Sequence, residues 1–215
     1  MSELVPIPSP GVPMYWGGPA NPLVILVHDW YGRLPWLEFY GETLAHEGYL
    51  IAAPDLYGGV ATVDEHDAAA LMESLDLAAA LAELDRIVAL AHAEGTRKIA
   101  LIGFSMGGWI SLLHAQSGSA DAVVAYYATL AQADHGVIPC PVLLHLAEED
   151  EWADGEDPDG FMLRLTDHGT PVTSHTYPDT VHGFANASIP DKIDTHAAAV
   201  AFARTVSFLR EHFRD

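Results

Sequence analysis

The chain has 215 residues, half of them apolar, and a formal net charge of -21 at pH 7, because 30 acidic residues outnumber 9 lysines and arginines. Such a field repels phosphate backbones and anionic lipid, so neither nucleic acid nor a membrane surface is expected as a partner. The length suffices for one substantial core. We therefore expect a single domain over residues 1–215, and the acidity and compactness favour a monomer.

The N-terminal residues lack the basic and apolar regions of a secretory signal, and no apolar run approaches about 18 residues, the length of a membrane span. A cytoplasmic protein is expected. The one cysteine, Cys140, lies between two prolines at the start of an apolar run, which indicates a buried and unreactive thiol.

Short apolar runs of strand length alternate along the chain with longer segments of helical pattern. The predicted strands cover residues 23–28, 49–54, 98–104, 122–127, 141–146 and 172–177. The predicted helices cover about 35–47, 63–93, 107–117, 158–168 and 191–213, the second of them broken near Ser74–Asp76. Most strands are continuously apolar, as parallel strands covered on both faces are. The pattern predicts an α/β fold with a mostly parallel central sheet and helices on both faces.

Two spacings indicate where helices begin. Thr62 and Glu65 are spaced as a capping box at the start of the long helix. Ser188 and Asp191 repeat that spacing before the C-terminal helix, with aspartate in place of glutamate.

The segment LIGFSMGG at residues 101–108 places a serine between an apolar strand and a helix. Gly103 and Gly107 lie two positions on either side of Ser105, which is the GxSxG pattern of a nucleophile elbow. The turn is sharp, so its neighbours must be small, and it presents the hydroxyl at a helix N-terminus. Ser105 is therefore the candidate nucleophile at the carboxyl edge of the sheet.

A serine hydroxyl needs a base to take its proton and an acid to orient that base. Of the twelve histidines, His28 and His145 lie in apolar strands and are interpreted as core residues. His182 follows the strand at 172–177 after the short loop PDTV, which places it at the carboxyl edge. It is the candidate base.

The acid is expected between the serine and the histidine along the chain, the order that this architecture uses. The strand at 141–146 is followed by AEEDEWAD, a run that is otherwise typical of a solvated acidic loop. Asp150 is the first choice, because four residues past the strand give a turn that can reach the histidine. Asp154 is the alternative.

A tetrahedral intermediate also needs two hydrogen-bond donors for its oxyanion. The candidates are the backbone N–H of Met106, directly after the serine, and that of Trp30 in the DWYG loop after the first strand. No HExxH, CxxC, GxGxxG or P-loop spacing occurs, so neither a metal nor another cofactor is expected.

Six segments follow one another along the chain: LVILVHDWYG, GYLIAAPDLYGG, GFSMGG, AVVAYY, AEEDEW and VHGFA. Their order and approximate intervals resemble the dienelactone hydrolase family of α/β hydrolases, from about residue 22 to the end. The resemblance implies the α/β-hydrolase fold, a triad of Ser105, Asp150 and His182, and oxyanion donors at Trp30 and Met106.

Two departures from that family bear on the substrate. Ser105 stands where the dienelactone-specific members use cysteine, and Asp29 stands where they carry a glutamate, so Asp29 is interpreted as ordering the oxyanion loop. Asn186 replaces an arginine that holds the substrate carboxylate in those members, and residues 60–70 contain no basic residue. A neutral ester or lactone is expected rather than an anionic dienelactone.

Aromatic residues near the strand ends are candidates for the pocket wall, with Asp29 and Asn186 beside them: Trp30, Tyr31, Trp36, Tyr127, Trp152 and Phe184. No insertion between residues 127 and 141 is large enough for a lid, which predicts an open, shallow site for small acyl groups.

The sequence thus predicts a serine hydrolase that cleaves small, neutral carboxylic esters or lactones through an acyl-enzyme. Acyl transfer or short-peptide cleavage by the same triad is an alternative. A non-catalytic ligand-binding protein also stays open, because a fold does not by itself define a function.

Overall fold

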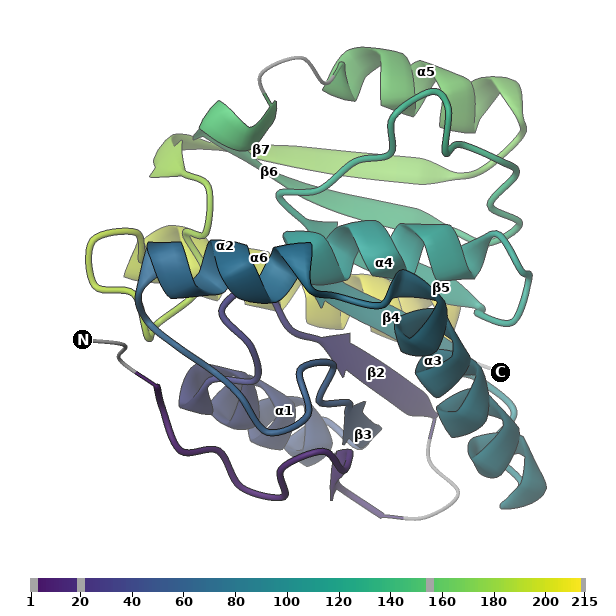
Figure 1. Ribbon diagram of the computed structural model, residues 1–215. Helices are drawn as coiled ribbons and strands as arrows, with labels where there is room; N and C mark the ends of the chain where they lie inside the picture. Colours follow the sequence, from purple (N-terminus) through teal and green to yellow (C-terminus); the bar gives the residue numbers. More distant parts are fainter. Residues whose placement is uncertain (1–3, 19–21, 154–156, 214–215) are drawn as a thin grey trace.

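A computed structural model of the protein describes residues 4–18, 22–153 and 157–213. In these ranges one sheet has the strand order β1-β3-β2-β4-β5-β6-β7 (Figure 1). The strands are β1 (Met14–Trp16), β2 (Leu23–Val27), β3 (Leu50–Ala53), β4 (Ile99–Phe104), β5 (Ala122–Tyr126), β6 (Val142–Glu149) and β7 (Val172–Val181). β1, which the sequence analysis missed, runs antiparallel to β3, and the other neighbours are parallel. The predicted α/β fold with a mostly parallel sheet is confirmed.

Helices flank this sheet on both sides. They are α1 (Pro35–His46), α2 (Glu65–Glu73), α3 (Leu77–Ala93), α4 (Met106–Ala115), α5 (Pro158–Asp167) and α6 (Thr195–His212), with a short 3-10 turn, η1, at Glu151–Ala153. α1 and α6 lie behind the sheet in Figure 1, and α3 and α4 lie in front of it. Every residue of β2, β4 and β5 is buried between these layers, which explains their unbroken apolar sequences. Within the described ranges, no helix is long and apolar enough to cross a membrane.

The predicted break in the long helix is confirmed, but its predicted cap is wrong. α2 ends at Glu73 and α3 begins at Leu77. Asp64, not Thr62, caps α2, because its carboxylate accepts a hydrogen bond from the Asp67 N–H at 3.0 Å. The Thr62 hydroxyl accepts from the Asp64 N–H, at 3.0 Å, so it shapes the approach to the helix rather than its first turn.

The start of the C-terminal helix also differs from the prediction of residue 191. Asp194 caps α6, since its carboxylate accepts from the Ala197 N–H at 2.7 Å. Ser188 and Asp191 lie before this cap, in a segment where the N–H groups of Lys192 and Ile193 donate to the Ile189 carbonyl. That turn satisfies the local backbone groups and delays the start of the helix to Thr195.

β6 and β7 are longer than the sequence predicts. Their pairing continues past an irregularity between Ala147 and Glu149, and Glu149 still pairs with Val181. Both strands therefore reach the edge of the sheet together. Asp150 and His182 each follow directly after a strand, where the sequence analysis placed a loop before each of them.

Candidate active site

The turn after β4 holds Ser105 in an unusual backbone conformation. Its φ of 52° and ψ of -119° place a non-glycine residue in a sparsely populated region, which costs about 1–3 kcal/mol. Two hydrogen bonds fix the turn, because the Ser105 N–H donates to the Tyr126 carbonyl and the Trp109 N–H donates to the Ser105 carbonyl, each at 2.9 Å. The strand and the following helix thus hold the hydroxyl at the carboxyl edge.

Glycine is required on both sides of this turn by close backbone contacts. A Cβ atom on Gly103 would lie 2.1 Å from the Gly107 carbonyl oxygen. A Cβ atom on Gly107 would lie 2.3 Å from the carbonyl oxygens of Val27 and His28 at the end of β2. The GxSxG spacing is therefore a packing requirement, which lets α4 begin against the end of a neighbouring strand.

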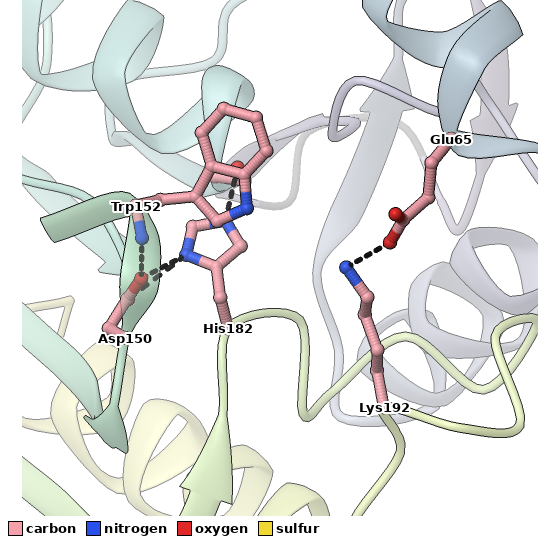
Figure 2. A network of polar contacts seen from close by, with 6 residues as sticks. Glu65, Asp150, Trp152, His182 and Lys192 are labelled. Atoms are coloured by element: carbon pink, nitrogen blue, oxygen red, sulfur yellow. Dashed lines mark hydrogen bonds and ion pairs between the residues drawn. The ribbon is translucent and has the colours of Figure 1, made fainter. Parts of the chain in front are cut away.

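Three side chains from three strand ends form one hydrogen-bonded chain, of which Figure 2 labels Asp150 and His182. The Ser105 hydroxyl lies 2.6 Å from His182 Nε2. The carboxylate oxygens of Asp150 lie 2.8 and 2.9 Å from His182 Nδ1. Because a carboxylate can only accept, Nδ1 carries the proton and Nε2 is free to accept from the hydroxyl. The structure thus brings together the three residues that the sequence analysis singled out, whereas the alternative acid, Asp154, lies outside the described residues.

Asp150 and His182 are largely shielded from water, with side chains 13% and 12% exposed. The Trp152 backbone N–H donates to Asp150 Oδ1 at 3.0 Å, which fixes the carboxylate while it faces the histidine. The rings of Tyr127 and Trp152 lie 4.9 and 6.0 Å from the imidazole. A partly desolvated, oriented carboxylate of this kind can stabilise an imidazolium when the histidine takes a proton.

The two candidate oxyanion donors lie in different elements. Met106 is the first residue of α4, and Trp30 lies in the turn after β2. Neither backbone N–H has an acceptor within the part of the chain that the structure describes. The Met106 side chain is held by the Tyr57 hydroxyl, which donates to its sulfur at 3.1 Å.

A cavity of about 480 Å³ opens beside Ser105. Several of the predicted site residues line it: Ser105, Met106, Tyr127, Asp150, Trp152 and His182. Other lining residues were not predicted from the sequence, among them Met72, Trp109, Leu146, Thr176 and Asp159. A sequence signal existed for Trp109, because a residue four positions after Ser105 lies one helical turn along the same helix.

Four of the six predicted aromatic residues do not line this cavity, and all four are buried in the core. Trp36 is buried against Phe104, with ring centroids 4.7 Å apart. Phe184 is buried between Tyr127 and Tyr177. These buried rings belong to the core rather than to the cavity wall.

The other two are Tyr31 and Trp30. Tyr31 points away from the cavity, since its hydroxyl donates to Glu65 at 3.3 Å. Trp30 packs edge-on against Trp152, with ring centroids 4.8 Å apart, so it supports the wall without forming it.

Asp29 and Asn186, the predicted polar neighbours of the wall, lie outside the cavity as well. They are hydrogen-bonded to each other at 2.7 Å. Among the residues that the structure describes, no three His, Cys, Asp or Glu side chains gather in a group that could hold a metal ion.

The comparison with known protein families agrees with this geometry. The model of the dienelactone hydrolase family matches residues 12–213. The chain belongs to the dienelactone hydrolase family. A lactone is a cyclic carboxylic ester, so this membership places the protein among the carboxylic ester hydrolases.

Individual members of the family are distant relatives. The chain is 28% identical over 210 residues to Protein usf of Aquifex pyrophilus, covering 92% of this chain and 90% of that one. It is 27% identical over 204 residues to a carboxymethylenebutenolidase of Rhodococcus opacus, covering 88% and 81% of the two chains. Among solved structures, the dienelactone hydrolase-like promiscuous phosphotriesterase P91 from metagenomic libraries superposes with a TM-score of 0.73 at 20% identity, over 94% and 92% of the two chains. That last similarity establishes the shared α/β-hydrolase fold.

Proposed function

We propose that the protein hydrolyses small, neutral carboxylic esters or lactones, with Ser105 as nucleophile, His182 as general base and acid, and Asp150 as the residue that orients the imidazole. The observation that carries this proposal is the hydrogen-bonded chain from Ser105 through His182 to Asp150, which begins on a strained turn. A strained elbow that lifts a hydroxyl toward a histidine has a catalytic use and no evident benefit for stability.

The reaction follows from the positions of these groups. Ser105 Oγ attacks the ester carbonyl carbon while His182 Nε2 takes the hydroxyl proton, and Asp150 stabilises the resulting imidazolium. The N–H groups of Met106 and Trp30 receive the oxyanion. His182 then returns the proton to the departing alkoxide. The acyl group stays bound to Ser105. Water, deprotonated by His182, then attacks that acyl group. His182 returns the proton to Ser105 Oγ as the bond between this oxygen and the acyl carbon breaks, which releases the carboxylic acid and restores the serine hydroxyl.

The preference for a neutral substrate is supported by the charges around the cavity. Its described lining residues include the carboxylates of Asp150, Asp157 and Asp159 and no lysine or arginine. Asn186, which stands where the dienelactone-specific members carry an arginine, is buried against Asp29 and is not available to a ligand. A substrate carboxylate would therefore meet like charges without a cation to pair with.

The proposal is tested by labelling the purified protein with a fluorophosphonate and locating the adduct by mass spectrometry, alongside turnover of p-nitrophenyl acetate and butyrate. We expect one adduct on Ser105, and we expect Ser105→Ala to lose labelling and to lower turnover by up to about 10⁶-fold. Ser117→Ala is the matched control, because Ser117 is exposed just beyond the C-terminal end of α4. Folded protein that neither labels nor turns over any ester would instead support a ligand-binding role.

A further inference from the structure

The side chain of Asp29 shapes the turn that follows β2. Its Oδ1 accepts from the Tyr31 N–H at 3.0 Å, and the Asp29 carbonyl accepts from the Gly32 N–H at 3.2 Å. A side chain that accepts from the N–H two residues ahead is an Asx turn, which fixes the peptide groups in between. The peptide group between Asp29 and Trp30 carries the Trp30 N–H, so the carboxylate sets the orientation of that candidate oxyanion donor.

Asn186 makes the corresponding contacts in the turn that follows His182. The Asn186 N–H donates to the Gly183 carbonyl at 2.8 Å, and its side-chain Oδ1 accepts from the Ser188 N–H at 2.8 Å. This second bond settles the orientation of the amide, because the Ser188 N–H can only donate. Asn186 Nδ2 therefore points toward Asp29 and donates to its Oδ2 at 2.7 Å.

The bond between these two turns is buried and involves a titratable carboxyl group. Asp29 is 2% exposed and Asn186 is 1% exposed. Burial raises the pKa of Asp29 to about 7, and the hydrogen bonds from Asn186 and Tyr31 oppose that rise. Lys192, the cation whose charge also opposes it, is paired with Glu65 at 2.7 Å (Figure 2). A buried carboxylate held mainly by amide donors is a costly way to join two loops if joining them were its only role.

We propose that Asp29 and Asn186 are a pair of positioning residues. Their hydrogen bond fixes the positions of the Trp30 N–H and the His182 imidazole relative to each other, so that both are correctly placed around the ester carbonyl. This inference rests on the proposed function, because it assigns the pair an effect on the attack by Ser105. Neither residue lines the cavity, so the pair acts on the rate of the chemical step and leaves substrate binding nearly unchanged.

The donors and acceptors of the pair predict how variants behave. In Asp29→Asn, the oxygen of the new amide still accepts from the Tyr31 N–H, but the nitrogen of that amide meets the donating Nδ2 of Asn186. In Asn186→Asp, two carboxylates face each other in a buried space. In the exchanged variant Asp29→Asn/Asn186→Asp, the new amide donates to the new carboxylate, and both backbone N–H groups keep an acceptor.

The experiment measures kcat and KM for p-nitrophenyl acetate in the wild type, the two single variants, the exchanged variant and Ser105→Ala, with thermal unfolding of each. We expect each single variant to lose roughly 10- to 100-fold in kcat, with KM changed by less than about threefold. We expect the exchanged variant to regain kcat to within about threefold of the wild type, which is strong coupling between the two sites.

Each outcome bears on a distinct claim. Single variants that keep full kcat, or an exchanged variant that folds and stays as impaired as the single ones, overturn the role of the pair. If the single variants fail to fold, the exchanged variant decides alone, because it retains every hydrogen bond. Wild-type turnover that survives in Ser105→Ala overturns the proposed function itself, and this inference with it.

Discussion

Backbone contacts surround Ser105, whereas side-chain contacts at the rim of the sheet surround Asp150. On the first side, Gly103 and Gly107 approach carbonyl oxygens so closely that no side chain fits, and every residue of β2 and β4 is buried. On the second side, Asp150 lies at the end of a strand near the sheet edge, held by one backbone N–H, and its neighbour Trp152 is 47% exposed.

The difference shows how one site combines rigidity with adaptability. The elbow side is built from atoms that every residue has, so its geometry does not depend on which side chains surround it. The rim side is built from side chains that can be exchanged without disturbing the core. Variants on the rim are therefore expected to change activity and leave the free energy of unfolding nearly unaltered, whereas changes on the elbow side are expected to alter stability.

Apart from loss of the nucleophile itself, the largest effect is expected at the acid on the rim. Asp150→Asn keeps the size of the side chain but offers an amide to His182 Nδ1, which favours the wrong tautomer, so we expect kcat to fall by about 10⁴-fold. Thermal unfolding should shift by no more than a few degrees, because the residue lies at the rim. Steady-state kinetics with p-nitrophenyl acetate and differential scanning fluorimetry on the same samples make both measurements.

Glu149→Gln is the matched control for that prediction. Glu149 is the neighbouring carboxylate and is exposed, so its neutralisation should leave kcat within about twofold. A loss of turnover in Asp154→Asn with full activity in Asp150→Asn would show that the orienting acid has been assigned to the wrong residue.

An intermediate effect is expected on the elbow side, in the dependence of stability on pH. His28 is fully buried, its Nε2 accepts from the Leu56 N–H, and burial lowers its pKa to about 4, below the ordinary value of 6.5. The unfolded chain takes up a proton below pH 6.5 and the folded protein does not until about pH 4. The contribution of His28 to the free energy of unfolding is therefore fully present above the ordinary pKa. It falls by about 3 kcal/mol as the pH drops to about 4.

This contribution is measured by urea unfolding of the wild type and of His28→Gln, at a series of pH values from neutral down to about 4. The glutamine retains an acceptor and a donor without a proton to gain, so its stability should fall less steeply with pH than that of the wild type. Dilute samples are needed because the isoelectric point is about 4.6. Parallel curves for the two proteins would mean that the buried imidazole does not carry the acid sensitivity.

The same contrast between elbow and rim explains what the sequence could predict. Ser105 and its glycines were predictable because the constraint lies within five consecutive residues. Asp150 and His182 followed from the order of strands, although the structure shows each directly after a longer strand than the pattern suggested. The cap at Asp64 was missed because Thr62 offers an equally good spacing, and only the path of the chain decides between them.

The pocket wall was the least predictable part, because the direction of a side chain depends on packing between elements that are distant in sequence. Trp36 and Phe184 lie near strand ends, as Tyr127 and Trp152 do, yet their rings complete the core. Met72 lines the cavity from α2, and nothing in its local sequence distinguishes it from other exposed helical residues.

The smallest effect is expected at the exposed part of that wall. The Trp152 ring lies between Trp30 and His182, with centroids 4.8 and 6.0 Å away, and it borders the cavity from the water side. Trp152→Ala keeps the backbone N–H that holds Asp150, so kcat should be nearly unchanged, while KM for p-nitrophenyl butyrate should rise by roughly 3- to 10-fold through the lost aromatic contact. Trp152→Phe should retain most of the affinity. A fall in kcat with unchanged KM would instead mean that the ring contributes to the reaction, because it shields Asp150 and His182 from water. The rim would then be part of the catalytic machinery and not only a wall for the substrate.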